Sequence, residues 1–175
     1  MKIKNNSAVF LDRDGVINFD YGYINSIERF KLIPGTIEAL KKIQKCGYMI
    51  IVITNQSGIG RGLFTEDEYQ AVNRYMKSIF KMNNIIISGV YHCPHSPDDD
   101  CSCRKPKIGL IKKAASIHNI DISKSILIGD KRSDIEAGNI AKIPECFYIG
   151  DSTIIEKCSG TYKSLYRLVC EKFII

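Results

Sequence analysis

Two aspartates, Asp12 and Asp14, follow an apolar run at 8–11, and their spacing can support chemistry. The run is typical of a buried strand, and Gly15 then lets the chain turn sharply. Two carboxylates this close do not readily both stay ionised without a cation or a shared proton. The pair therefore indicates a metal site, a division of acid and base roles, or both. The alternative is a strand followed by a solvated Asp-Gly turn.

Further polar side chains stand at the ends of two other apolar, β-branched runs, 48–54 and 125–129. The residues at or after these ends are Thr54, Asn55, Gln56, Ser57, Asp130 and Lys131, with Asp134 four residues beyond Asp130. The carboxyl ends of parallel strands meet at one edge of a sheet. We therefore expect these groups and Lys105, which precedes a helical pattern, to share a cleft with Asp12 and Asp14.

This set of groups has a definable chemistry. Three carboxylates without a soft ligand suit a hard octahedral ion, and Mg²⁺ is the expected one. A hydroxyl, an amide and a lysine suit an oxyanion such as phosphate. A carboxylate can be the nucleophile in phosphoryl transfer through an aspartyl-phosphate. Each fragment alone is common in turns, but four in this order, each after a strand-like run, are much more specific.

Strand-like and helical patterns alternate along the chain. Strands are expected at 8–11, 48–54, 85–91, 125–129 and 145–149, the last as a shorter edge strand. Helices are expected at 36–46, 66–83, 107–118, 133–142 and 161–173, the last packed on the sheet. Thr65 and Glu68 predict a capping box at one helix start. The alternation predicts one α/β domain over residues 1–175, with a doubly wound, Rossmann-like parallel sheet.

The composition is that of an ordinary globular protein, with 175 residues, 45% hydrophobic and 25% charged. No apolar run approaches the ~20 residues of a membrane span, and the N-terminal apolar stretch is too short for a signal peptide. We therefore expect a cytoplasmic monomer with no membrane partner. The net charge of +6 can steer an anionic substrate. Without an Arg-rich run or a basic–aromatic interleave, no nucleic-acid partner is expected.

The loop 93–103 carries a cluster of metal-ligand residues. Its candidate ligands are Cys93, His95, Cys101 and Cys103. Three thiolates and one imidazole form a complete tetrahedral set for Zn²⁺, and such a closed site supplies folding energy rather than catalysis. The alternatives are reduced cysteines in a flexible loop, or a zinc-finger DNA module, which would need a basic recognition helix. Because Arg104 and Lys105 follow Cys103 directly, zinc would make rigid the loop that brings these cations to a phosphate.

The order of these motifs resembles the signature of the haloacid-dehalogenase-like phosphatases. The matching residues are Asp12-x-Asp14-Gly15-Val16, Thr54, Lys105, and Gly129-Asp130 with Asp134, so the resemblance runs from residue 8 to about residue 150. It implies that Asp12 is the nucleophile that attacks phosphorus. It implies that Asp14 is the general acid that protonates the leaving oxygen and later activates water. Thr54 and Lys105 are implied to bind the transferring phosphoryl group.

The same resemblance implies a set of metal ligands. Asp12, the backbone carbonyl of Asp14, and Asp130 are expected to hold Mg²⁺. Asp134 is expected to orient that shell rather than bind the ion, and Arg13 to point away from the nucleophile.

Many members of this superfamily carry a large cap domain. Here residues 19–47 are expected to hold only a loop and one helix, and residues 58–92 only one helix and one strand. Neither segment has room for a cap. The site is therefore predicted to be open, with short loops that select the substrate.

The metal-ligand loop narrows the resemblance further. Cys-Pro-His…Cys-x-Cys-Arg-Lys-Pro is similar to the branch that contains the heptose-1,7-bisphosphate phosphatases and the histidinol-phosphate phosphatases. Residues 18–23, residues 54–65 and Lys131 resemble the heptose enzymes, whereas the short stretch between His95 and Cys101 resembles the histidinol-phosphate enzymes. The implied substrate contacts are Asp20, Tyr21, Gly22, Tyr23, Asn55, Gln56, Ser57, Arg104 and Lys131.

Four functions follow as hypotheses. The first is Mg²⁺-dependent removal of the 7-phosphate of D-glycero-D-manno-heptose 1,7-bisphosphate, in nucleotide-heptose and lipopolysaccharide precursor synthesis. The second is a histidinol-phosphate phosphatase, favoured by the acidic run 98–100 but opposed by the cations Arg61, Arg104 and Lys131. The third is a non-enzymatic, metal-stapled phosphate-binding module. A nucleic-acid end phosphatase would need a basic track beyond the cleft.

Overall fold

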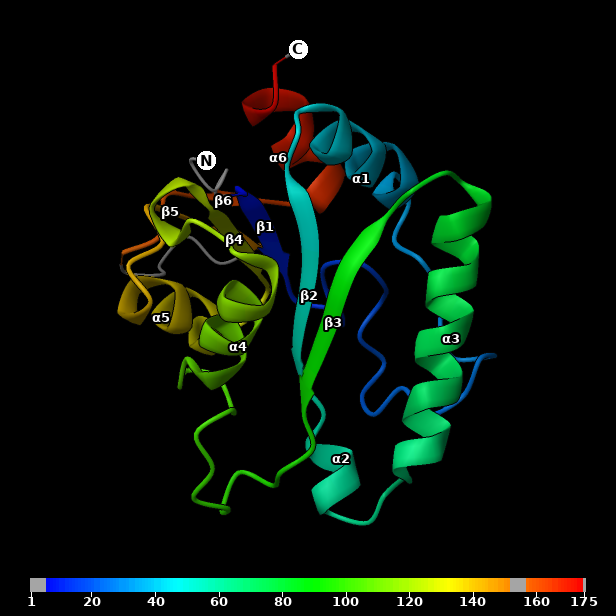
Figure 1. Ribbon diagram of the computed structural model, residues 1–175. Coiled ribbons are helices and arrows are strands. Elements are labelled where there is room, and N and C mark those ends of the chain that lie inside the picture. The colour runs from blue at the N-terminus through cyan, green and yellow to red at the C-terminus, as the bar shows by residue number, and fades with distance from the viewer. Residues whose placement is uncertain (1–5, 152–156, 175) are drawn as a thin grey trace.

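The computed structural model describes residues 6–151 and 157–174, and a six-stranded parallel sheet forms its centre (Figure 1). The strands are β1 (Ala8–Leu11), β2 (Met49–Asn55), β3 (Ile87–Cys93), β4 (Ile126–Gly129), β5 (Glu145–Ile149) and β6 (Gly160–Tyr162). Their order is β3-β2-β1-β4-β5-β6, and every neighbouring pair is parallel. This confirms the doubly wound α/β prediction, with the change of winding direction beside β1.

Helices cover both faces of the sheet (Figure 1). One face packs against α1 (Thr36–Lys45), α3 (Glu66–Met82) and α6 (Leu165–Lys172), and the other against α4 (Gly109–His118) and α5 (Arg132–Ile140). The described residues also form a short helix, α2 (Ser57–Gly60), and a 3₁₀ turn (Ile122–Lys124). None of the helices in the described ranges is long and apolar enough to cross a membrane.

The side chains of β1 alternate between the two cores. Val9 and Leu11 pack in the core under α1, α3 and α6, while Ala8 and Phe10 pack in the core under α4 and α5. A strand between two helical layers must be apolar on both faces, which explains its continuous apolar run. Complete burial of a side chain such as Phe10 contributes roughly 1.5–3 kcal/mol.

Two sequence-based predictions are wrong at the C-terminal side of the sheet. β5 was expected at an edge, but it lies between β4 and β6, and β6 takes the edge. The helix expected over 161–173 begins only at Leu165, because Gly160–Tyr162 forms β6. Ser164 caps α6 by accepting a hydrogen bond from the backbone N–H of Arg167. A three-residue strand beginning with glycine has no apolar run that would reveal it.

The predicted capping box begins α3. The Thr65 hydroxyl accepts from the backbone N–H of Glu68 at 3.2 Å, and the Glu68 carboxylate accepts from the backbone N–H of Thr65 at 2.7 Å. The box provides acceptors for two backbone N–H groups that would otherwise have no partner at the start of the helix. It fixes the start of α3 at Glu66.

The loops at the carboxyl edge of the sheet are short. The segment 19–34 forms turns and bends, with an antiparallel bridge between Asn18 and Leu32. Between β2 and β3, the described chain contains only α2, α3 and their connections. Neither insertion forms a separate cap, in agreement with the predicted open site.

Candidate active site

Three carboxylates cluster at the carboxyl edge of the sheet. Asp12 follows β1, Asp130 follows the neighbouring β4, and Asp134 lies in the first turn of α5. Each offers an oxygen, and these oxygens lie within 4.8 Å of one another. Burial, with the neighbouring carboxylates, raises the pKa of Asp12, and it raises the pKa of Asp130 to about 8. Three carboxylates this close together favour the binding of a cation, because a cation would offset their mutual repulsion.

The donor atoms of this cluster fit a hard metal ion. Oδ1 of Asp130 is buried, and no residue in the described ranges donates a hydrogen bond to it. Carboxylate oxygens without thiolate or imidazole are the ligands that Mg²⁺ prefers. A bound ion would therefore satisfy an acceptor that the protein leaves without a partner.

Lys105 is the buried cation of the site. Its ammonium lies 3.0 Å from Oδ1 of Asp12 and 2.6 Å from Oδ1 of Asp134, and it donates to the carbonyl of Ile53 at 2.8 Å. Burial opposes the charge, but the two carboxylates outweigh it and raise the pKa of Lys105. Lys105 is therefore cationic and can stabilise negative charge that develops beside Asp12.

The end of β2 also holds the backbone of Lys105. The side-chain oxygen of Asn55 accepts from the Lys105 N–H at 3.0 Å, and its amide nitrogen donates to the Lys105 carbonyl at 3.1 Å. The sequence interpretation gave Asn55 a substrate contact. In the structure Asn55 also helps to position Lys105. Its side-chain amide holds the Lys105 backbone, while the Ile53 carbonyl accepts a hydrogen bond from the Lys105 ammonium.

Asp14 is held by four hydrogen bonds. Arg13 donates to both of its oxygens, from Nε at 3.0 Å and from Nη2 at 2.9 Å. Asn18 and Gln56 each donate to one oxygen at 2.8 Å. Burial opposes ionisation, but the Arg13 charge and these hydrogen bonds lower the pKa of Asp14. Asp12 and Asp14 thus have pKa values moved in opposite directions, and a cation bound by Asp12 and Asp130 would lower the raised pKa of Asp12.

Gln56 connects Asp14 to Thr54. Its amide nitrogen donates to Asp14 and also to Oγ1 of Thr54, at 2.9 Å. Because this hydroxyl oxygen accepts from Gln56, the hydroxyl hydrogen of Thr54 can be donated elsewhere. Thr54 can therefore donate to an oxygen of a phosphoryl group beside Asp12.

A pocket of about 210 Å³ opens beside these groups. Its lining residues are Asp14, Asp20, Gly22, Tyr23, Asn55, Gln56, Ser57 and Lys131. At its rim Lys131 pairs with Asp20 at 3.1 Å, and Tyr23 accepts a hydrogen bond from Arg61 at 3.1 Å. Most of the predicted substrate contacts thus line one pocket, next to the predicted acid and base.

Two predicted substrate contacts do not line this pocket. Tyr21 is exposed, and its ring stacks on Phe19 with the centroids 5.8 Å apart. Arg104 lies in the metal-ligand loop, and its Nη1 is buried without a hydrogen-bond partner in the described residues. Their roles in binding substrate stay predictions.

The sequence interpretation did not find how Asp14 is held. It left the role of Arg13 open and treated Asn18 only as part of a loop. The sole sequence signal was proximity, since both residues lie within four positions of Asp14. Which way a side chain points at a turn depends on the packing around it.

Gly15 permits the close approach of the loops after β1 and β4. Its φ is +86°, and a Cβ at this position would overlap the Asp130 carboxylate. We expect Gly15→Ala to displace Asp130 and weaken Mg²⁺ binding by about tenfold or more. The Mg²⁺ concentration that gives half-maximal activity measures this effect.

Gly47→Ala is the matched control for this substitution. Gly47 has a φ of +84°, and no heavy atom lies within 4 Å of its added Cβ. It carries the same left-handed backbone cost of roughly 1 kcal/mol without touching the site. Equal Mg²⁺ requirements in the two variants would show that Gly15 is needed only for the turn.

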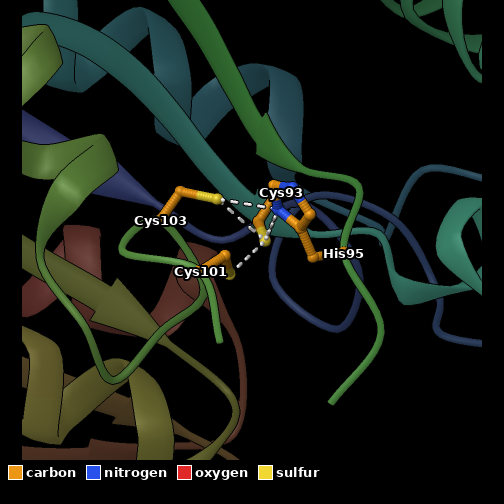
Figure 2. A group of neighbouring side chains, drawn as sticks. All are labelled: Cys93, His95, Cys101 and Cys103. Atoms are coloured by element: carbon orange, nitrogen blue, oxygen red, sulfur yellow. Dashed lines mark hydrogen bonds between the residues drawn. The ribbon is translucent and has the colours of Figure 1, made fainter. Parts of the chain in front are cut away.

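A second cluster, formed by sulfur and imidazole ligands, lies beyond the end of β3 (Figure 2). Its members are Cys93, His95, Cys101 and Cys103. The Cys93 sulfur lies 3.6 Å from that of Cys101 and 3.1 Å from that of Cys103. Nδ1 of His95 lies 3.5 Å from the Cys93 sulfur and 3.2 Å from the Cys103 sulfur.

These separations suit a tetrahedral zinc ion. With Zn–S bonds of about 2.3 Å and a Zn–N bond of about 2.0 Å, ligand atoms would lie roughly 3.5–3.8 Å apart. The four ligand atoms are close to this arrangement, and all four protein ligands are supplied, which leaves no open position for a substrate. The cluster thus fits a structural metal.

The metal-ligand loop is fastened to the rest of the site. The backbone N–H of Gly60, at the end of α2, donates to the Pro94 carbonyl at 2.8 Å, and the N–H of Gly109, at the start of α4, donates to the Ser102 carbonyl at 3.1 Å. In Figure 1 the loop accordingly runs between the end of β3 and the start of α4, beside α2. Ordering this loop therefore helps to order Lys105, which lies two residues after Cys103.

Comparison with known proteins places this arrangement in a family. The model of the family described as polynucleotide kinase 3 phosphatase matches residues 18–163. A crystal structure of a putative had-like phosphatase from Mesorhizobium loti superposes with a TM-score of 0.82, at 27% identity and over 95% of this chain and 85% of that one. The chain belongs to this family of haloacid-dehalogenase-like phosphatases. It is a hydrolase of phosphoric monoesters.

Similar phosphatases have more specific names. The chain is 44% identical to D-glycero-beta-D-manno-heptose-1,7-bisphosphate 7-phosphatase of Haemophilus influenzae, over 79% of this chain and 78% of that protein. It is 47% identical to D-glycero-alpha-D-manno-heptose-1,7-bisphosphate 7-phosphatase of Photorhabdus laumondii, over 81% of each.

A structural neighbour of this phosphatase carries the expected ion. The crystal structure of D,D-heptose 1,7-bisphosphate phosphatase from B. bronchiseptica, complexed with magnesium and phosphate, superposes with a TM-score of 0.85. The two chains are 26% identical, over 94% of this chain and 97% of that one. Phosphatases of this class use Mg²⁺, in agreement with the hard carboxylate donors that Asp12 and Asp130 offer.

Proposed function

We propose that this phosphatase removes the 7-phosphate of D-glycero-D-manno-heptose 1,7-bisphosphate, as a step in nucleotide-heptose and lipopolysaccharide precursor synthesis. The observation that carries the proposal is the pocket beside Asp14, because it joins the reacting groups to a rim that bears Lys131. Lys131, which pairs with Asp20, and Arg61, which donates to Tyr23, bring two cations to this rim, and these suit a substrate with a second negative charge away from the reacting phosphate. The names of relatives that are 44% and 47% identical support the same substrate.

The reaction begins at Asp12. Its carboxylate oxygen attacks phosphorus, the bond between phosphorus and the sugar oxygen breaks, and that oxygen takes a proton from Asp14 in its protonated form. The Thr54 hydroxyl and the Lys105 ammonium stabilise the charge on the phosphoryl oxygens. Asp134 keeps Lys105 in place through their 2.6 Å contact.

The second step releases phosphate from Asp12. Asp14, now a carboxylate, removes a proton from a water molecule whose oxygen attacks the phosphoryl group. The bond between phosphorus and the Asp12 oxygen breaks, and both aspartates return to their starting states. Asp12, the backbone carbonyl of Asp14, and Asp130 would hold Mg²⁺, which would supply positive charge for the phosphoryl oxygens.

The cysteine–histidine cluster is assigned Zn²⁺ in a structural role. The donor set and its spacing support zinc over Mg²⁺, because three thiolates and an imidazole are soft or intermediate ligands. The monomeric state and the cytoplasmic location stay predictions from the sequence.

A substrate panel tests the proposal. Phosphate release is measured with both anomers of the heptose bisphosphate, with histidinol phosphate, and with a 3′-phosphorylated oligonucleotide. We expect kcat/KM for one bisphosphate anomer to exceed that for histidinol phosphate by about a hundredfold, because a cationic rim favours an anionic over a cationic substrate. Fast turnover of histidinol phosphate or of the oligonucleotide, with slow turnover of both bisphosphates, would reject this substrate.

A further inference from the structure

Arg13 stands between the two catalytic aspartates, and the reaction described above gives it no task. Its side chain is completely buried at 0% exposure. It donates to Oδ1 of Asp14 from Nε and to Oδ2 from Nη2. A buried guanidinium that makes two parallel hydrogen bonds to a carboxylate fixes the plane of that carboxylate.

The other two donors to Asp14 restrain it less. Asn18 contacts only Oδ1 and Gln56 contacts only Oδ2. Rotation of the carboxylate about its Cβ–Cγ bond would stretch either single bond, but it would break both bonds from Arg13 together. The orientation of Asp14 therefore depends most on Arg13.

Arg13 is itself supported by an aromatic stack. Its guanidinium carbon lies 5.3 Å from the ring centroid of Tyr69, a buried residue of α3. On β3, the His92 ring centroid lies 4.2 Å from that of Tyr69, and Nε2 of His92 lies 3.0 Å from a carboxylate oxygen of Glu66. The guanidinium thus rests on residues of α3 and β3, which join it to the rigid part of the fold.

We propose that Arg13 is a positioning residue that holds the Asp14 carboxylate at the angle needed for proton transfer to the leaving oxygen, with Tyr69 fixing Arg13. The inference rests on the proposed function in one respect, since Asp14 is the acid of that reaction. In the first step Asp14 carries a proton in place of one of its two single hydrogen bonds, from Asn18 or Gln56, and this proton passes to the sugar oxygen as the P–O bond breaks. Arg13 exchanges no proton and does not touch the substrate.

The test compares two leaving groups on one enzyme sample. An alkyl phosphate, here the heptose bisphosphate, needs a proton on its leaving oxygen, whereas p-nitrophenyl phosphate releases a stable phenolate without one. With enzyme in excess over substrate, the first-turnover rate reports formation of the phosphoryl-enzyme. For Arg13→Lys we expect the alkyl rate to fall about thirtyfold and the aryl rate to change less than about threefold. The ratio of the two rates does not depend on how much of the variant is folded.

Three further variants serve as comparisons for Arg13→Lys. Thr54→Val is expected to lower both rates to a similar extent, because Thr54 acts on the phosphoryl group of either substrate. Tyr69→Leu should also lower the alkyl rate more than the aryl rate, but by a smaller factor than Arg13→Lys does. Tyr75→Leu makes the same change at a more exposed position of α3 and should alter neither rate.

Two results separate failure of this inference from failure of the proposed substrate. If Arg13→Lys lowers the alkyl and aryl rates equally, or lowers neither, Arg13 does not position the acid. If the wild-type protein does not hydrolyse the heptose bisphosphate, the proposed substrate is wrong. The comparison of Arg13 variants is then made with histidinol phosphate, which is also an alkyl ester, and it decides the role of Arg13 as before.

Discussion

Asp12→Asn is expected to abolish phosphate release, with a loss of about ten-thousandfold or more, while the protein stays folded. The amide that replaces the carboxylate cannot attack phosphorus, and it removes one expected metal ligand. The fold should tolerate the change because Lys105 keeps its 2.6 Å contact with Asp134. Phosphate release from the heptose bisphosphate and thermal unfolding of the same sample measure the two effects, and Tm should move by less than about 4 °C.

Asp67→Asn provides the matched control, because Asp67 is exposed in the first turn of α3. It should retain wild-type activity. Activity of Asp12→Asn near that of the control would reject the aspartyl-phosphate mechanism. A biological role that survives this substitution would favour the non-enzymatic phosphate-binding module.

The second large effect concerns the cysteine–histidine cluster. Removing zinc with a chelator, or replacing one ligand as in Cys103→Ser, is expected to cost about 4 kcal/mol and to lower Tm by roughly 10 °C. The loop 93–103 has few apolar side chains to order it otherwise. Activity should fall only to the extent that loss of the metal also disorders Lys105. Zinc content and thermal unfolding, with and without chelator, measure the effect.

Cys170→Ser changes an exposed cysteine of α6 and should alter neither zinc content nor Tm. A metal-free protein that is as stable and active as the untreated one would contradict a structural role for zinc. An active but destabilised metal-free protein would support it, because a purely structural ion takes no part in the reaction.

The sequence predicted the central strands and most helices well because their signals are local. Continuous apolar runs identify β1, β2 and β4, which are buried on both faces. The two errors have one source: β6, with three residues, is too short to carry a pattern, and because it was missed β5 was placed at the edge of the sheet. Helix α2 was missed for a similar reason, since Ser57–Gly60 contains two glycines, which disfavour helix in the usual propensities.

The candidate site was predictable as a set of residues but not as a network. Strand ends and loop motifs in the sequence alone indicated Asp12, Asp14 and Lys105. They did not reveal that Asn55 holds the backbone of Lys105, or that Arg13 holds Asp14 at both oxygens. These contacts depend on which direction each side chain takes at a turn, and only packing between distant segments decides that direction.

The position of β1 has a consequence for the newly made chain. β1 emerges from the ribosome first, yet its neighbour β4 comes far later, and the hydrogen bond from the Ala8 N–H to the Ser125 hydroxyl joins residues 117 positions apart. Contacts of such long sequence separation form late and slow folding. Asp12 is therefore synthesised long before its partner Asp130. The cluster that joins Asp12 to Asp130 and Asp134 can therefore form only after synthesis has passed β4.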